Sequence, residues 1–313
     1  MKKILVLGAY GQLGTCLQEC AFDRKSGFGQ PVWVFKDRVD FDVTTPEGAL
    51  QSRLYEINPA LIINCAAYTN VNKCEDVDTQ EVCYVLNSDY PARLAHYCKD
   101  NHIKLIHISS DYVFSGDVEP GMEYIENTTT SLIDPKNEYG RSKLMGEYNV
   151  LRYNPQGFII RISNLVSVHS INFVKTIVKK ILAGEPELFV TPDHIAYLTS
   201  AHDFALELVK LSNKYLIGSD DSLHPTKTDI LHYTSTPSGS FYDFAIMIRD
   251  SLERFGVPVR TEIVPKCIET PVERPKVSML NSKYTQQRWG MKVKPIENTI
   301  EKIIVSLINT RNK

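Results

Sequence analysis

Short apolar segments alternate with amphipathic segments through the first half of the chain. The apolar segments have the length of buried strands and cover residues 4–7, 32–35, 61–64, 104–109 and 158–162. A helix is expected from about Gln12, and a second from Thr45-Pro46-Glu47, where a capping residue and a first-turn proline precede apolar residues at helical spacing. Such alternation predicts a parallel sheet with helical crossovers, which is an α/β fold.

The pattern changes after about residue 162. Loops rich in Pro, Asp, His and Thr separate the helices expected at residues 173–182, 204–211 and 242–255, and a last helix carries apolar residues from 296 to 307. We therefore expect one domain over residues 1–164 and a smaller α/β domain, mainly over residues 165–313. This division allows some later segments to return to the first domain.

Three glycines, Gly8, Gly11 and Gly14, follow the first expected strand at intervals of three. Without a Cβ, glycine lets the backbone turn sharply and approach a pyrophosphate, whose charge then lies on the free N–H groups of the helix start. This pattern predicts a Rossmann-type, doubly wound sheet with a dinucleotide site at the turn. Tyr10, Gln12 and Leu13 belong to the same turn, so we expect them to contact the cofactor.

Tyr139 and Lys143 lie four apart on an expected helix, so their side chains share one face. A phenol has a pKa of about 10, and a nearby ammonium would lower it by ~1–3 units, towards values that suit general acid catalysis. Ser110 follows the strand at 104–109, at the end where parallel sheets bind ligands, and its hydroxyl can bond a carbonyl oxygen. Taken singly, the Tyr–Lys spacing also fits a solvated helix face and Ser110 a helix cap. The order of the three motifs favours catalysis.

With these motifs in this order, nearly the whole chain resembles the extended short-chain dehydrogenase/reductases, in the branch typified by dTDP-4-dehydrorhamnose reductase. Further segments carry the resemblance, namely residues 40–43, 64–69, 73–75, 85–87 and 274–280. The resemblance implies reduction of the keto group of a nucleotide-diphospho-4-keto-6-deoxysugar by NAD(P)H. It also implies that Tyr139 is the acid, that Lys143 tunes it and binds the nicotinamide ribose, and that Ser110 orients the carbonyl.

The resemblance places further residues around the two ligands. Cofactor contacts are implied for Asp42, Val43, Cys65, Ala66 and Ala67, and substrate contacts for Thr69, Asp111, Asn164, Phe173 and Arg274. After the second strand, Lys36 and Arg38 flank Asp37. A basic group there accommodates the phosphate of NADP, whereas an acid binds the free ribose of NAD. We therefore expect NADP with NAD tolerated, although these charges also fit a solvated loop.

Three segments depart from the branch where the sugar should lie. Asn164 replaces a tryptophan, Ala196 and Leu198 replace a glycine and a proline, and Ser170 begins the run before Phe173 in place of glycine. A short amide in place of an indole predicts a wider, more polar pocket, and so a ketosugar other than the rhamnose precursor. A merely divergent loop that still accepts the rhamnose precursor remains the alternative.

Two other functions stay open at this stage. Arg161 and Asn164 form an Arg-x-x-Asn run that resembles sugar-nucleotide epimerases and dehydratases, which keep their cofactor bound through turnover. The residues from Ile108 to Phe114 also resemble the regulatory beta subunit of methionine adenosyltransferase, which binds a partner instead of turning over. Retention of the triad alone therefore does not decide between a reductase, an epimerase and a regulatory subunit.

Composition narrows the class further. The 313 residues are 43% hydrophobic and 23% charged with a net charge of -2, which supplies apolar residues for one large or two moderate cores. No basic cluster indicates a nucleic-acid polymer, and no apolar run reaches the ~20 residues of a membrane span. We expect a cytoplasmic protein with a nucleotide-sugar substrate, and leave a homodimer open. Seven scattered cysteines predict reduced thiols, and the histidine spacing predicts no structural metal.

Overall fold

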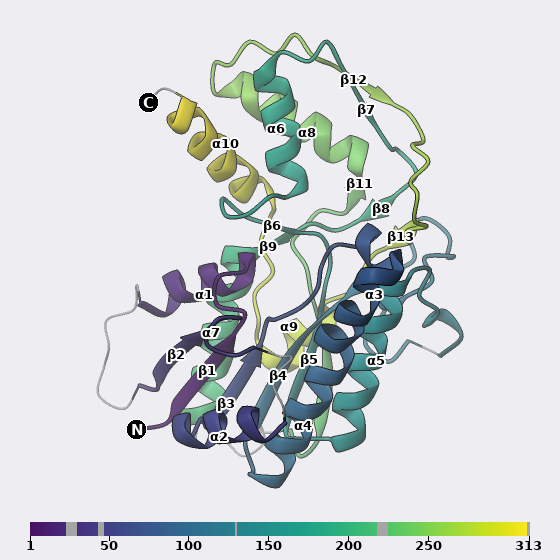
Figure 1. The fold of residues 1–313 in the computed structure, drawn as a ribbon. Coiled ribbons are helices and arrows are strands. Elements are labelled where there is room, and N and C mark those ends of the chain that lie inside the picture. Colours follow the sequence, from purple (N-terminus) through teal and green to yellow (C-terminus); the bar gives the residue numbers. More distant parts are fainter. Residues whose placement is uncertain (23–29, 43–46, 129, 218–224, 312–313) are drawn as a thin grey trace.

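The computed structural model describes residues 1–22, 30–42, 47–128, 130–217 and 225–311. Its largest sheet has six parallel strands in the order β10-β5-β4-β3-β1-β2 (Figure 1). These strands are β1 (Lys3–Leu7), β2 (Val32–Lys36), β3 (Leu61–Asn64), β4 (Lys104–Ser110), β5 (Gly157–Ile162) and β10 (Thr228–Tyr233). The chain runs outwards from β1 to β2 and returns on the other side of β1 at β3, so the strand order reverses there. Ligands bind at such a reversal, beyond the carboxyl ends of the strands.

Helices cover both faces of this sheet, which confirms the expected doubly wound α/β fold (Figure 1). Ile4 and Val6 of β1 pack into one core and Leu5 and Leu7 into another, because successive side chains of a strand point to opposite faces. The first core includes α1 (Gln12–Phe22) and α7 (Ala201–Ile217). The second includes α2 (Glu47–Ile57), α4 (Tyr90–Asp100) and α5 (Glu138–Tyr153).

Three segments from beyond residue 164 pack with the six-stranded sheet and its covering helices. β10 pairs with β5, α7 packs on α1, and α9 (Lys283–Trp289) packs on β10. The Trp289 ring meets Phe158 of β5 edge-on, with centroids 4.7 Å apart. The sheet is therefore completed by later parts of the chain.

The second lobe has its own apolar core, formed by α6 (Phe173–Ala183), α8 (Phe241–Arg254) and α10 (Glu297–Arg311). Caps fix these helices: Asn172 accepts from the Lys175 N–H, and Ser240 and Asp243 form a capping box at α8. The short strands outside the main sheet are β6 (Leu165–Val166), β7 (Glu187–Val190), β8 (Ile195–Ala196), β9 (Thr199–Ser200), β11 (Gly239–Ser240), β12 (Glu262–Pro265) and β13 (Val277–Ser278).

A continuous helical segment precedes β4. It comprises α3 (Val77–Tyr84), a π-helical turn η2 (Val85–Asp89) and α4, after a 3-10 turn η1 (Asn72–Glu75). Two further 3-10 turns are η3 (Asp111–Val113) and η4 (Thr130–Leu132). The π turn carries Asn87, whose side chain exchanges two hydrogen bonds with the Tyr68 backbone. That exchange fixes the segment that follows β3.

Cys74 and Cys83 form a disulfide, so the expectation that all seven cysteines are reduced is wrong for this pair. The chain folds back between η1 and α3 and brings the two Cα atoms to 5.8 Å, within the range that a disulfide spans. A spacing of nine residues matches no familiar cysteine motif, so the sequence offered no signal. No disulfide is formed by the other five cysteines, all within the described residues: Cys16, Cys20, Cys65, Cys98 and Cys267.

Two expectations fall outside the described residues, namely the cofactor contact of Val43 and the helix start at Thr45-Pro46. Within the described ranges, no helix combines the length and apolar character needed to cross a membrane.

Candidate active site

The glycine turn lies at the carboxyl end of β1. Gly8 has a φ of +79°, and a Cβ there would come within 2.8 Å of the Ala66 nitrogen. A Cβ on Gly14 would overlap the Gly8 carbonyl oxygen, which also accepts from the Gly11 N–H at 3.1 Å. Residues with side chains therefore do not fit at positions 8 and 14. The free N–H groups at the start of α1 are left facing a space that suits a pyrophosphate.

A cavity of about 410 Å³ opens beside this turn, walled by Gly8, Tyr10, residues 65–68 and Arg38. Phe41 forms part of its floor, whereas Asp42 does not border it.

The basic pair expected at this cavity is split. Lys36 does not border the cavity, and its ammonium pairs with Asp40 at 3.3 Å. Asp37 borders it, but its Oδ1 accepts from the Val39 N–H at 2.9 Å. Of the two cations, Arg38 lines the space, and the contact of Lys36 with the cofactor stays a prediction.

Ser110, Tyr139 and Lys143 border one cavity of about 490 Å³. Ser110 ends β4, and the other two lie on α5. Gln12, Leu13 and Gly14 of the glycine turn form another part of its wall. Gly11, Cys65 and Ala67 border both this cavity and the previous one, so the two are adjacent. The fold thus brings the three predicted catalytic side chains to one place, next to the predicted cofactor turn.

Burial raises the pKa of the Tyr139 phenol above its ordinary value, and a hydrogen bond with Ser110 opposes this only in part. The expected lowering by Lys143 is not found. The Lys143 ammonium instead donates to the Ile108 carbonyl oxygen at 2.7 Å. Burial lowers the pKa of Lys143 to about 8, against the opposing charge of Glu147. At neutral pH the phenol therefore keeps its proton, as a proton donor must.

Asp111 was expected to contact substrate, but its carboxylate is engaged by the protein. Ser110 Oγ donates to Oδ1 at 3.0 Å and Ser163 Oγ to Oδ2 at 2.8 Å. The residue is only 1% exposed, and burial raises its pKa. Asp111 borders the cavity while its oxygens orient two serine hydroxyls, so its contact with the substrate stays a prediction.

A third cavity, of about 630 Å³, lies in the second lobe. Of the residues expected at the substrate, Phe173, Arg274 and Asn164 border it, while Thr69 borders the cavity that Tyr139 lines. Tyr112 and Asn164 border both of these spaces. The three cavities therefore lie next to one another, from the glycine turn, past Tyr139, to the second lobe.

Asn164 stands at this junction with a φ of +35°, a left-handed conformation that asparagine tolerates better than bulky residues do. Its amide donates to Ser163 Oγ at 3.0 Å and to the Tyr197 carbonyl oxygen at 3.3 Å. Ala196 borders the third cavity, but Leu198 is buried in the lobe's core and does not. Of the two replaced loop residues, only Ala196 can therefore touch a ligand directly.

The sequence analysis missed several residues of this site. Tyr112 meets the Tyr139 ring edge-on, with centroids 5.4 Å apart. Glu147 lies one turn beyond Lys143 and forms a buried two-point pair with Arg161, at 2.9 and 2.6 Å. The spacing of four between Lys143 and Glu147 was a usable signal. No sequence signal marks the Ile108 carbonyl oxygen.

One group among the described residues could hold a metal. Cys16, Glu19 and His169 each offer a ligand atom, all within 4.8 Å of one another. His169 Nε2 lies 2.9 Å from Glu19 Oε1, so the two form an ion pair when the imidazole is protonated.

Comparisons with known proteins agree with this geometry. Residues 1–308 match the family model described as RmlD substrate binding domain. A dTDP-4-dehydrorhamnose reductase of Aggregatibacter actinomycetemcomitans is 31% identical, over 97% of this chain and 98% of that protein. A dTDP-4-keto-6-deoxy-D-glucose reductase of Streptomyces niveus is 32% identical, over 78% and 76%.

Solved structures show the same fold. A dTDP-4-dehydrorhamnose reductase of Clostridium acetobutylicum superposes with a TM-score of 0.82 at 28% identity, over 98% of this chain and 99% of that one. The Bacillus anthracis enzyme, solved in complex with NADP, gives 0.80 at 29% identity, over 97% and 99%. With a family model spanning almost every residue and relatives matching end to end, the chain belongs to the family of the RmlD substrate binding domain.

Proposed function

We propose that this protein reduces the keto group of a nucleotide-diphospho-4-keto-6-deoxysugar with NADPH. One observation carries the proposal: Ser110, Tyr139 and Lys143 border a cavity that is adjacent to the cavity at the glycine turn and to the cavity of the second lobe. Two ligands bound in these adjacent cavities would meet at Tyr139. The relatives named for dTDP-linked ketosugars, and the Bacillus anthracis structure with NADP, support the same reaction.

We assign each side chain a task. NADPH, when bound, supplies the hydride that reaches the carbonyl carbon. Tyr139 gives its phenolic proton to the carbonyl oxygen, so hydride and proton together turn the ketone into an alcohol. Ser110 orients that oxygen, and the Lys143 ammonium, which borders the same cavity, is assigned to the nicotinamide ribose. A positioned acid of this kind contributes ~10²–10⁴ to the rate.

The residues around the glycine turn fit a dinucleotide. Positions 8 and 14 have no room for a Cβ, so the backbone is open to a pyrophosphate. We assign the 2′-phosphate of NADP to Arg38, because Lys36 is paired with Asp40 and Asp37 is committed to the Val39 N–H. NAD lacks that phosphate, so its binding is expected to be weaker but present.

The nucleotide part of the substrate is assigned to the cavity of the second lobe. Phe173, Ile177 and Leu188 give it apolar walls, and the Arg274 guanidinium offers donors for a diphosphate. Asn164 stands between this cavity and Tyr139, where the sugar ring would lie. Its short amide leaves room for a polar sugar, which supports a ketosugar other than the rhamnose precursor.

We assign the enzyme to the cytoplasm, in agreement with the absence of a membrane-spanning helix from the described residues.

A homodimer is supported by apolar side chains that are exposed on two adjacent helices. They are Val77 and Val82 on α3 and Met145 and Tyr148 on α5. Sedimentation at micromolar concentration tests the homodimer.

The reaction is tested by mixing the purified protein with NADPH and a panel of nucleotide-linked 4-ketosugars, and following the absorbance of NADPH. We expect at least one member to be consumed with kcat/KM near or above ~10⁴ M⁻¹s⁻¹. The Tyr139→Phe variant is the matched control, because it removes one hydroxyl and leaves the ring. No consumption with any member, or equal rates for the variant, would refute the proposal.

A further inference from the structure

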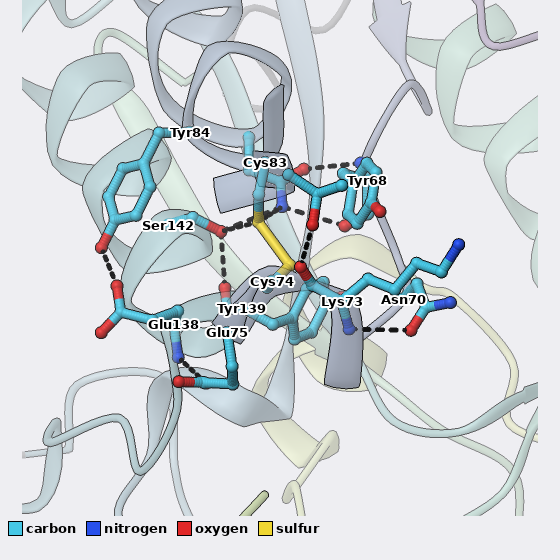
Figure 2. Close-up of a disulfide and its surroundings, with 12 residues drawn as sticks. Tyr68, Asn70, Lys73, Cys74, Glu75, Cys83, Tyr84, Glu138, Tyr139 and Ser142 are labelled. Carbon is cyan, nitrogen blue, oxygen red and sulfur yellow. Dashed lines mark hydrogen bonds between the residues drawn. A yellow bond between two sulfur atoms is a disulfide. The ribbon is translucent and has the colours of Figure 1, made fainter. Parts of the chain in front are cut away.

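The disulfide lies beside the helix that carries Tyr139 and Lys143 (Figure 2). It joins Cys74 of η1 to Cys83 of α3, and both residues are fully buried. Neither cysteine borders any of the three cavities, so the proposed reaction does not use them directly. Two sets of contacts nevertheless connect this disulfide to the first turn of α5.

The first set holds Glu138, the residue before Tyr139. Glu75, which follows Cys74, accepts from the Glu138 N–H at 2.7 Å (Figure 2). Tyr84, which follows Cys83, donates its hydroxyl to Glu138 Oε2 at 2.8 Å. The Glu138 N–H is one of the donors that a helix start leaves without a partner, so Glu75 caps α5. The neighbours of both half-cystines thus hold the same residue of the catalytic helix.

The second set reaches the Tyr139 backbone. Cys83 Sγ lies 3.3 Å from Ser142 Oγ, which donates to the Tyr139 carbonyl oxygen at 2.7 Å (Figure 2). The Asn87 amide donates to the same Ser142 Oγ at 3.0 Å and lies 3.6 Å from Cys83 Sγ. Cys83 Sγ therefore belongs to a buried cluster of polar side chains, one of which is hydrogen-bonded to the Tyr139 backbone.

We propose that Cys74 and Cys83 are positioning residues for the carbonyl reduction: their disulfide fixes the first turn of α5, and with it the Tyr139 hydroxyl. This inference rests on the proposed function, in which Tyr139 is the proton donor. Without the S–S bond, the two sulfur atoms separate to a non-bonded distance and the covalent cross-link between η1 and α3 is lost. A displacement of about 1 Å in a reacting group costs up to ~10²-fold in rate.

The same link makes the rate depend on the redox state. A dithiol reduces the disulfide in two steps. One of its thiolates attacks a cystine sulfur, which breaks the S–S bond, releases one cysteine and leaves a mixed disulfide; its second thiolate then attacks the reagent's own sulfur in that mixed disulfide and releases the other cysteine. Two electrons and two protons end on Cys74 and Cys83, and the dithiol becomes a cyclic disulfide. Cytosolic disulfides of mesophiles are usually catalytic or redox-sensing. The oxidised enzyme is thus the fast form, and the reduced enzyme the slow one.

The test compares the full-length protein before and after dithiothreitol, with thiol labelling and mass spectrometry to score Cys74 and Cys83. We expect reduction to lower kcat about tenfold while the dissociation constant for NADPH stays within about twofold, because neither cysteine borders the cofactor cavity. Hydrogen exchange at the amides of residues 138–142 should quicken. Reoxidation should restore both properties.

Two variants sharpen the result. Cys74→Ser/Cys83→Ser should behave like the reduced enzyme and ignore the dithiol. Cys267→Ser removes an exposed thiol that borders none of the three cavities, and it should keep both the rate and its response. Hydrogen exchange needs no substrate, so it still tests whether the disulfide fixes the first turn of α5 when no ketosugar is reduced. A failure to reduce any ketosugar would refute only the proposed function. Unchanged kcat and exchange after verified reduction, or a purified protein that never forms the bond, would overturn the inference.

Discussion

Glu147→Gln should damage both the stability of the protein and the chemistry of Lys143. Glu147 on α5 and Arg161 on β5 are 1% and 2% exposed at their side chains, and they are joined by two hydrogen bonds. The amide keeps the shape of the carboxylate but removes its charge, which leaves a buried guanidinium without a counterion. Breaking a buried pair in this way costs about 3–5 kcal/mol.

The same substitution acts on catalysis through Lys143. The charge of Glu147 supports the ammonium against burial, and even with this support the pKa of Lys143 falls to about 8. Without it, Lys143 should lose its proton at lower pH. The alkaline fall of kcat/KM should then move towards neutral pH, because kcat/KM reports the groups of the free enzyme.

Urea unfolding followed by circular dichroism gives the free energy of unfolding, and rates from pH 6 to 10 give the profile. The matched control is Glu301→Gln, which breaks the exposed pair with Arg254 and should cost about 0–1 kcal/mol without moving the profile. A loss below ~1 kcal/mol for Glu147→Gln together with an unmoved alkaline limb would refute this account of the pair.

Three further predictions follow from the site. Tyr139→Phe should lower kcat by ~10²–10⁴ with little change in NADPH affinity by calorimetry, and near wild-type turnover would contradict its role. Arg38→Ala should weaken the binding of NADPH ~10- to 100-fold and leave the binding of NADH nearly unchanged, whereas Lys36→Ala should change neither affinity. If calorimetry shows the larger loss of NADPH affinity for Lys36→Ala, the assignment to Arg38 is wrong. In the wild type, kcat/KM should stay constant from pH 6 to 7 and fall above about pH 8, because Lys143 loses its charge there while Tyr139 stays protonated. A kcat/KM that keeps rising to pH 9 would contradict this role of Lys143.

The sequence predicted those strands that consist of a continuous apolar run. The strands at residues 4–7, 61–64 and 104–109 were visible because each is an apolar run ended by small or polar residues. β10 was not visible, because Asp229 and His232 interrupt its apolar character, and only its pairing with β5 makes it a strand. The pairing partner of a strand is a property of the whole fold.

In the candidate site, too, short motifs were visible in the sequence, whereas contacts between distant segments were not. Spacing along the chain predicted Gly8, Ser110, Tyr139 and Lys143 as site residues, each from a short motif with a chemical reason, and the fold places them at two adjacent cavities. Spacing failed for the pKa of Tyr139, which burial controls, and it did not indicate the serine hydroxyls that bond Asp111. It also failed for the disulfide, since a backbone reversal between η1 and α3 brings the cysteines together.

The most direct test of the proposed reaction is the fate of the hydride. The protein is incubated with NADPH deuterated at the transferable C4 position and a nucleotide-linked 4-keto-6-deoxysugar, and the product is read by NMR and mass spectrometry. The account predicts one deuterium on the former carbonyl carbon of the sugar for each NADP formed. An altered sugar without deuterium and without net loss of NADPH would show an epimerase or dehydratase instead, and an unchanged sugar would contradict enzymatic reduction altogether.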